Sequence, residues 1–379
     1  MARWTSSTAM GFSPPKIALF FPGQGVQRVG MATSWLEAFP RTCEPFLQEM
    51  DDILQTPLSR IIAEGPNSTL TATKNAQPAI MATSIMILRV LEQEFGFKTA
   101  ERVDVTLGHS LGEFAALVAG GYLEYRNALI MIRQRAEAMA RCTREASQAD
   151  NGAEYGMVAL ICEPERLISL IETIHSFLEP THSSPGFDSI DEGEGDYENP
   201  IKNVSIANTN SKNQLVLSGS IPHIKALLVQ LRQFGGHDPR AVRLSSDSPF
   251  HSPVMLPAKA FMVSLLEKTP VKFPGLFPCI SNVAAVPFRS AEDLKDLLAR
   301  QCVETVRWWD TIKYVDQEMG VRRWVGLGPG KVGRNLVGKE VGMKGADGIR
   351  GGGVWGVSDP REAEEVIRGL EMTERMAES

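Results

Sequence analysis

The sequence predicts an α/β protein, with a main domain built on a parallel sheet and a smaller α+β lobe inserted into it. Three observations support this fold class. A short continuous apolar run at residues 17–21 is typical of a strand buried on both faces of a parallel sheet. A strand-like run at 103–107 leads through a glycine-rich turn into a helical stripe. Beyond residue 145 the composition changes, and short strands alternate with helices.

The overall composition is that of a globular protein. With 379 residues and 43% hydrophobic residues, the chain can bury a sizeable core. Its formal net charge of −6 argues against nucleic acid or an anionic membrane surface as the main partner, and no apolar run approaches the length that crosses a bilayer. The five cysteines are scattered, without the paired spacing of a zinc site or a disulfide framework. We therefore expect free thiols, no metal, and neither a nucleic-acid nor a membrane partner.

Residues 1–15 differ from the rest of the chain. They are rich in Ser and Thr, contain Arg3 but no acidic residue, and end in two prolines. This composition fits the remnant of an organelle transit peptide, which favours a mitochondrial location. The alternative is a disordered N-terminus without a targeting role, in a cytoplasmic protein.

The first expected strand, at 17–21, ends in a glycine-rich loop, Pro-Gly-Gln-Gly-Val-Gln at 22–27. Such loops can bind phosphate, but Gly-x-Gly-x-x-Gly is absent and no Gly-Lys-Ser/Thr follows. We expect the main chain to approach a ligand closely here, and no nucleotide site. Helical stripes broken by proline follow at 32–64, and a strong helix at 76–95 has Pro78 near its start.

The stretch 103–122 organises the chain. Its strand-like run enters Gly-His-Ser-Leu-Gly-Glu at 108–113, and a helical stripe follows. This is the setting of a nucleophile elbow, because glycines at 108 and 112 let the main chain turn sharply while Ser110 stays exposed. The N–H of Leu111, at the helix start, would point at an oxyanion formed there. The pattern also occurs by chance, so the rest of the chain must supply a base.

A long helix is expected from residue 125 to about 141, and it contains Arg133 and Arg135. One or both could face the site, although solvated arginine is the usual outcome. The smaller lobe follows at 152–242, with strands expected at 156–162, 204–207 and 214–219 and helices near 164–177 and 222–234. It contains an acidic segment at about 178–200, which has little to pack and is predicted to be a disordered insertion.

The main domain is expected to comprise 16–145 and 243–379. A Ser-Pro-Phe-His-Ser-Pro loop at 248–253 follows what we expect to be a main-domain strand near Arg243. Later, a strand-like run at 324–327 leads into Gly-Pro-Gly-Lys at 328–331. Residues 353–357 are expected to add an edge strand, and 360–376 a final helix.

Serine needs a base to accept its proton, and histidine is the usual one. Four of the six histidines lie in or beside the smaller lobe or its insertion: His175, His182, His223 and His237. His109 adjoins Ser110 on a tight turn, where the two side chains should diverge. His251 is therefore the candidate by elimination. No acidic residue stands out as a third member, which disfavours an ordinary hydrolase with the order Ser, Asp or Glu, His.

Six features occur in order along the chain: Phe-Pro-Gly-Gln-Gly at 21–25, Gly-His-Ser-Leu-Gly-Glu at 108–113, Arg135, Ser-Pro-Phe-His at 248–251, Gln301 and Gly-Pro-Gly-Lys at 328–331. In this order and spacing the set resembles malonyl-CoA:acyl carrier protein transacylases. The likeness runs from about residue 16 to 339, apart from the insertion. It implies an α/β-hydrolase-like core with a parallel sheet and a small ferredoxin-like subdomain.

The resemblance also implies a role for each position. Ser110 would be the nucleophile and His251 the general base, with Gln301 orienting the imidazole through its main-chain carbonyl. A neutral carbonyl can fix the histidine tautomer, which explains the missing acid. The main-chain N–H groups of Gln24 and Leu111 would form the oxyanion hole.

Two more positions concern the substrate. Arg135, chosen over Arg133 because the family pattern places it there, would bind the free malonyl carboxylate through two parallel hydrogen bonds. Phe250 would fill the space beside the malonyl Cα and disfavour a methyl branch. The implied reaction is a ping-pong transfer of malonyl from malonyl-CoA to the phosphopantetheine thiol of acyl carrier protein, for fatty acid biosynthesis. We expect no cofactor and a monomeric enzyme.

Three other interpretations stay open at this point. A serine hydrolase or thioesterase with the same elbow would release free malonate. A non-catalytic scaffold or carrier-protein-binding module would leave Ser110 with a structural role. A discrete acyltransferase of a polyketide synthase would share these features, and the sequence separates it poorly from one of fatty acid synthesis.

Overall fold

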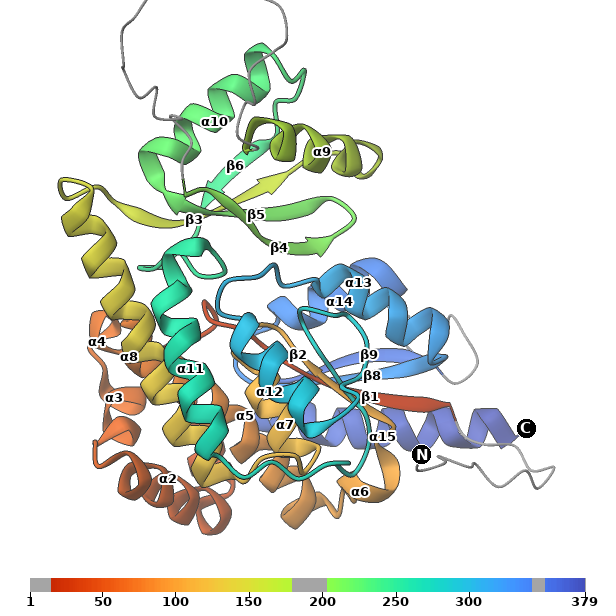
Figure 1. The fold of residues 1–379 in the computed structure, drawn as a ribbon. Helices are drawn as coiled ribbons and strands as arrows, with labels where there is room; N and C mark the ends of the chain where they lie inside the picture. The colour runs from red at the N-terminus through yellow and green to blue at the C-terminus, as the bar shows by residue number, and fades with distance from the viewer. Residues whose placement is uncertain (1–14, 179–202, 343–351, 379) are drawn as a thin grey trace, which may run out of the picture.

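The computed structural model describes residues 15–178, 203–342 and 352–378 (Figure 1). The chain forms two sheets, one in the main domain and one in the smaller lobe. Residues 1–14 of the expected N-terminal segment and 179–200 of the expected insertion lie outside the described ranges, so the expectations about them stay predictions.

The main domain contains a five-stranded parallel sheet in the order β7-β2-β1-β8-β9. Successive side chains of the central strand point to opposite faces. Ile17, Leu19 and Phe21 therefore enter one hydrophobic core, whereas Ala18 and Phe20 enter the other. Burial on both faces explains the continuous apolar run in the sequence. The strands are β1 (Lys16–Phe21), β2 (Val105–Gly108), β7 (Cys279–Ile280), β8 (Val321–Leu327) and β9 (Gly353–Val357).

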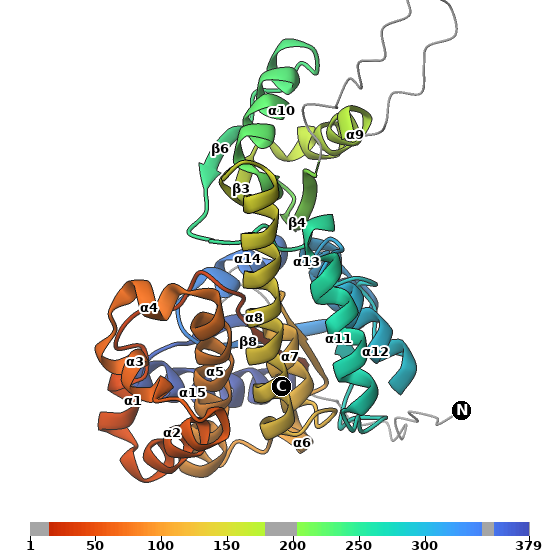
Figure 2. The same ribbon diagram turned by 60° about the vertical axis from the view of Figure 1, so that its left-hand side comes forward.

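Helices cover both faces of this sheet (Figures 1 and 2). On one side lie α5 (Thr73–Phe95), α7 (Gly112–Ala119), α8 (Tyr125–Ala149) and α15 (Pro360–Glu378), and on the other α13 (Trp308–Lys313) and α14 (Val332–Val341). The remaining α-helices of the main domain are α1 (Thr33–Ala38), α2 (Pro40–Leu54), α3 (Leu58–Glu64), α4 (Asn67–Thr71), α6 (Thr99–Arg102), α11 (Leu256–Lys268) and α12 (Ala291–Arg300). Helix α8 extends past the expected end near 141, because no helix breaker occurs before Gly152.

The smaller lobe contains a four-stranded antiparallel sheet in the order β4-β5-β3-β6. Its strands are β3 (Tyr155–Ile161), β4 (Ser205–Ser211), β5 (Gln214–Ser220) and β6 (Arg240–Arg243). Helices α9 (Leu167–Leu178) and α10 (Ile221–Gln233) pack on the face away from the main domain (Figure 1). The chain order β-α-β-β-α-β and this strand order are ferredoxin-like. The predicted fold class is therefore confirmed.

One expectation about the connection to His251 is wrong. The strand before the loop at 248–253 does not belong to the main domain, because β6 pairs with β3 at the edge of the smaller sheet. β6 has only four residues, Arg-Ala-Val-Arg, and none of them is buried. A short, exposed edge strand has no apolar pattern that would assign it to either sheet.

All five cysteines are free thiols, and four of them are buried. Within the described ranges, no group of three or more His, Cys, Asp or Glu side chains has the geometry to hold a metal ion. No described helix has the length and apolar character needed to cross a membrane.

Candidate active site

The turn between β2 and α7 has the geometry of a nucleophile elbow. Ser110 has a φ of 51°, in the left-handed region that side chains with a Cβ rarely adopt. A Cβ on Gly108 would lie 2.0 Å from the main-chain carbon of Gly112, and one on Gly112 would lie 2.5 Å from the carbonyl oxygen of Phe21. Both positions therefore require glycine, because the strand, the turn and the helix are in main-chain contact.

Ser110 and His251 form a hydrogen-bonded pair. Ser110 Oγ lies 2.8 Å from His251 Nε2, and His251 Nδ1 lies 2.7 Å from the main-chain oxygen of Gln301. Because a carbonyl only accepts, Nδ1 carries the proton and Nε2 is free to accept one from the hydroxyl. Burial, and then the positive charge of Arg135, lower the pKa of His251 to about 3. The imidazole is therefore neutral at neutral pH, as a general base must be.

The side chain of Gln301 joins three parts of the site. Its Oε1 accepts a hydrogen bond from Arg135 Nη2 at 2.8 Å. Its Nε2 donates to the main-chain oxygen of Ser110 at 3.0 Å and to the carboxyl group of Glu113. Burial raises the pKa of Glu113 to about 8, while hydrogen bonds from Asn282 and Gln301 and the charge of Arg135 act in the opposite direction.

Arg135 is a buried cation with neutral hydrogen-bond partners. Only 1% of its surface is exposed, and its guanidinium carbon lies 5.6 Å from the ring centre of Phe114. Nη1 donates to Gln77 Oε1 at 2.9 Å, complementing the bond from Nη2 to Gln301. Within the described residues, its guanidinium makes no ion pair and its Nε has no hydrogen-bond partner. A carboxylate would be a stronger acceptor than either glutamine.

Arg133, the alternative in the sequence, has a different function. It donates to the main-chain oxygen of Lys74 at 3.1 Å and to Asn75 Oδ1 at 3.0 Å, and it pairs with Glu137. Pro78 has no N–H to donate to that Lys74 oxygen, so the guanidinium satisfies an acceptor that the proline leaves free. Arg133 therefore stabilises the start of α5.

The main-chain N–H groups of Gln24 and Leu111 belong to two segments of the chain that meet beside Ser110. Leu111 is the N-cap of α7, and Gln24 lies in the loop after β1. Neither N–H has a hydrogen-bond partner among the residues that the structure describes. The Gln24 side chain is held on both sides, donating to Thr73 Oγ1 at 3.2 Å and accepting from Gln77 Nε2 at 3.3 Å. Two unpaired donors beside a nucleophile suit an oxyanion.

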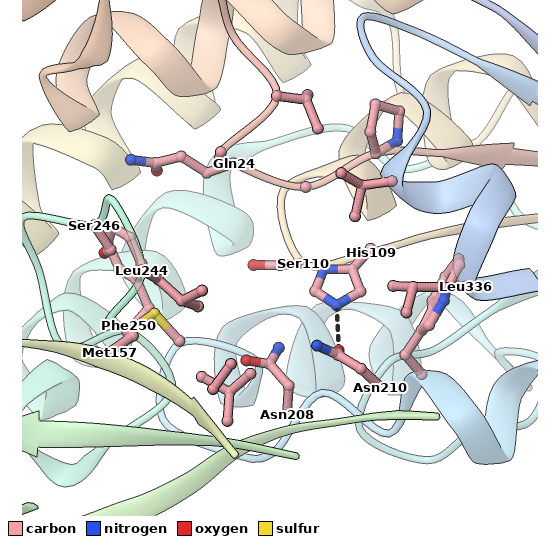
Figure 3. Close-up of a pocket in the computed structure, with 18 of the residues that line it drawn as sticks. Gln24, His109, Ser110, Met157, Asn208, Asn210, Leu244, Ser246, Phe250 and Leu336 are labelled. Atoms are coloured by element: carbon pink, nitrogen blue, oxygen red, sulfur yellow. Dashed lines mark hydrogen bonds between the residues drawn. The ribbon is translucent and has the colours of Figure 1, made fainter. Parts of the chain in front are cut away.

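A cavity of about 390 Å³ opens at Ser110 between the two lobes (Figure 3). The main domain contributes Gln24, His109, Ser110, Phe250 and His251, and the smaller lobe contributes Met157, Asn208 and Asn210. His109 Nε2 lies 2.9 Å from Asn210 Oδ1, so its side chain points away from the Ser110–His251 pair, as the sequence predicts. Arg135 and Gln301 lie behind this cavity and are not part of its lining.

The structure thus brings together the side chains of Ser110, His251, Gln301 and Arg135, with Phe250 on the cavity wall. The sequence reasoning missed Gln77, Asn210 and Asn282, and it assigned no role to Glu113. Glu113 lies inside the elbow motif, and Gln77 precedes the proline of α5, but neither position has a distinctive residue pattern. His175, His223 and His237 belong to the smaller lobe and do not line the cavity, whereas His182 lies outside the described residues.

Comparisons with known proteins agree on one family. The family model described as acyl transferase domain matches residues 19–170. The malonyl CoA-acyl carrier protein transacylase of Bacillus subtilis (strain 168) is 34% identical over 324 residues, which cover 86% of this chain and 90% of that protein. The transacylase of Escherichia coli (strain K12) is 27% identical over 84% of this chain and 90% of its own.

Solved structures give the same result. The acyl-carrier-protein S-malonyltransferase of Bartonella henselae superposes with a TM-score of 0.74 at 31% identity, covering 94% of this chain and 99% of its own. A malonyl transacylase solved in complex with its type II polyketide synthase acyl carrier protein also superposes with a TM-score of 0.74, at 27% identity, over 94% of this chain and 99% of that one.

Proposed function

Because the chain belongs to the malonyl CoA-acyl carrier protein transacylase family, we propose that Ser110 accepts a malonyl group from malonyl-CoA and passes it to acyl carrier protein. The protein is an acyltransferase. The observation that most supports Ser110 as the nucleophile is its 2.8 Å contact with a neutral His251 at a strained strand-to-helix turn.

In the first half-reaction, Ser110 Oγ attacks the thioester carbonyl as its proton passes to His251 Nε2. Negative charge develops on the carbonyl oxygen, and the free N–H groups of Gln24 and Leu111 stabilise it. The C–S bond then breaks, and His251 returns the proton to the departing CoA sulfur. A malonyl ester on Ser110 remains.

In the second half-reaction, the phosphopantetheine thiol of acyl carrier protein gives its proton to His251 and attacks the ester. The C–O bond to Ser110 breaks, and the serine recovers its proton from His251. Atoms and protons balance between the side chains and the two substrates, and the proposed steps use no metal or other cofactor.

Specificity for malonyl is assigned to Arg135. In the structure its two terminal nitrogens donate to the neutral oxygens of Gln77 and Gln301. A malonyl carboxylate would replace one or both of these acceptors, because a charge-assisted hydrogen bond is stronger than a neutral one. An acetyl group has no carboxylate that could accept hydrogen bonds from the buried guanidinium. Phe250, on the cavity wall, would restrict the space beside the malonyl Cα.

Transfer and hydrolysis can be separated directly. The purified protein is incubated with malonyl-CoA and holo-acyl carrier protein, and the products are identified by mass spectrometry. We expect malonyl-acyl carrier protein as the main product. Free malonate as the main product would instead identify a thioesterase.

The pathway we propose is fatty acid biosynthesis. Polyketide synthesis is a second candidate, since one structural relative was solved with a type II polyketide synthase carrier protein. Comparing kcat/KM for carrier proteins of the two pathways distinguishes them. A higher value for the fatty acid carrier supports the first, and a higher value for the polyketide carrier supports the second.

We also propose that the protein is mitochondrial and monomeric. The acid-free composition of residues 1–15, with Arg3, supports the location. Fusing residues 1–15 to a fluorescent protein tests whether this segment directs import. Sedimentation of the purified enzyme measures its oligomeric state.

A further inference from the structure

Asn282 lies under the nucleophile elbow, two residues after the end of β7, and is 1% exposed. Its side chain and main chain contact three points of the β2–α7 turn. Oδ1 accepts from the main-chain N–H of Ser110 at 2.7 Å, and Nδ2 donates to the main-chain oxygen of Gly108 at 2.6 Å. Its own main-chain N–H donates to Glu113 Oε1 at 2.9 Å.

These contacts act where the main chain is under strain. Ser110 has a positive φ, which is unfavourable for a residue with a Cβ and persists only where the surroundings enforce it. The turn also interrupts regular hydrogen bonding, since β2 ends at Gly108 and α7 begins at Gly112. The amide of Asn282 pairs with the carbonyl oxygen of Gly108, where β2 ends, and with the N–H of Ser110 in the turn itself, so a single planar group bridges the first half of the turn.

We propose that Asn282 is a positioning residue, whose side-chain amide holds the elbow so that Ser110 Oγ faces His251 and the Leu111 N–H stays available to an oxyanion. Asn282 does not line the cavity and therefore acts through Ser110. Its removal should slow the attack on the thioester, because small displacements of a nucleophile cost much of the rate. It should leave the binding of malonyl-CoA almost unchanged.

The experiment rests on the proposed role of Ser110 and measures single-turnover malonylation of the full chain by rapid quench and intact-protein mass spectrometry. We expect Asn282→Ala to lower the rate constant by a factor on the order of 10², with the half-saturating malonyl-CoA concentration changed by no more than about threefold. The matched control is Asn75→Ala. Asn75 is also buried, and its side-chain amide donates to the main-chain oxygen of Thr69 at 2.8 Å, away from the elbow.

If Asn282 had only a structural role, Asn282→Ala and Asn75→Ala would show the same reduction in malonylation rate for the same loss of thermal stability. That result would overturn the proposal. Equal malonylation rates in wild type and Asn282→Ala would also contradict the proposal. A different result, in which the wild-type protein itself takes up no malonyl group, would contradict the proposed function instead.

A second variant covers the case in which Asn282→Ala does not fold. Asn282→Asp keeps an acceptor for the Ser110 N–H but places a carboxylate oxygen opposite the Gly108 carbonyl, where only its protonated form can donate. Its malonylation rate relative to wild type should therefore rise as the pH falls. A pH-independent ratio would contradict the proposal. The other ionisable groups around this position are Glu113, Cys279, His251, Arg135 and Arg307. They are present in both enzymes, so the wild-type pH profile is the reference for the ratio.

Discussion

At the scale of single residues, the positive charge of Arg135 affects the pKa of His251. The guanidinium charge is the second cause, after burial, of the low pKa of His251. The carboxylate of a bound malonyl group would offset that charge, so the intended substrate also makes the base a better proton acceptor. Acetyl-CoA brings no such compensation.

Arg135→Ala should lower kcat/KM for malonyl-CoA and raise acetyl transfer relative to malonyl transfer. A hydrogen bond to a charged group contributes about 1.5–3 kcal/mol, so losing two should cost roughly 10²- to 10⁴-fold. Steady-state transfer assays with the two acyl-CoA substrates measure the ratio. Arg133→Ala, two residues earlier on α8, is the control and should leave the ratio unchanged. An unchanged ratio in Arg135→Ala would show that this residue does not select the carboxylate.

The pH dependence of acylation should reflect the pKa of His251. The base is active when deprotonated, and its pKa of about 3 lies well below the usual 6.5. The rate of Ser110 malonylation should therefore be nearly constant from about pH 7 down to about pH 5, and fall only at lower pH. A stopped-flow pH profile at malonyl-CoA concentrations well below saturation measures this, because the apparent second-order rate constant reflects the pKa values of the free enzyme. A fall centred near pH 6.5 would mean that the imidazole ionises normally.

The sequence was informative about residues only where a local pattern exists. Ser110 lies in a strand–turn–helix motif and His251 was found by elimination among six histidines, but the choice between Arg135 and Arg133 needed the family resemblance. Gln77 and Asn282 escaped notice because their partners are distant in the chain, 58 residues away for Arg135 and 172 for Ser110. Only the fold brings such pairs together.

At the scale of elements, the elbow is the part most sensitive to substitution. Gly112→Ala would place a methyl group 2.5 Å from the Phe21 oxygen in β1, and main chain cannot yield as a side chain can. We expect the free energy of unfolding to fall by roughly 3 kcal/mol or more. Urea denaturation measures it.

Gly96→Ala is the matched control for this substitution. Gly96 ends α5 with a φ of 65°, and its Cβ would meet nothing within 4 Å. Its cost should be about 1 kcal/mol, from backbone strain alone. Equal losses in the two variants would show that close packing of β1 against α7 is not what requires glycine at 112.

Elements with a strong apolar pattern were predictable from the sequence. β1, α5 and the edge strand β9 lie within a few residues of their expected positions, because burial on both faces or on one stripe determines their composition. β6 was assigned to the wrong sheet. Tertiary contacts determine that β6 pairs with β3, and the four exposed residues of β6 have no apolar pattern that would indicate this pairing.

At the scale of the whole molecule, the smaller lobe is fastened to the main domain beside the cavity. Main-chain hydrogen bonds join Thr209 of β4 to Val306 at 3.0 Å, and Val306 to Ala207 at 2.8 Å. The contact between His109 and Asn210 crosses the same boundary. Both walls of the cavity are therefore fixed by this attachment.

The acidic segment connects α9 to β4 and is predicted from its composition to be dispensable. Replacing residues 180–198 with a short Gly-Ser linker should change the transfer rate by no more than about twofold, since lengthening or shortening a loop costs little. A Gly-Ser segment of the original length separates the effect of composition from that of length. Loss of folding in both variants, seen by thermal denaturation, would show that the acidic residues belong to the fold.

Trapping the acyl-enzyme tests the central claim most directly. The protein is mixed with malonyl-CoA alone, weighed by mass spectrometry, and then chased with holo-acyl carrier protein. We predict that wild type gains one malonyl group, mapped to Ser110 by peptide sequencing, and loses it to the carrier, while Ser110→Ala gains none. A malonyl group on Ser110→Ala, or transfer to the carrier without any acylated enzyme, would contradict the account.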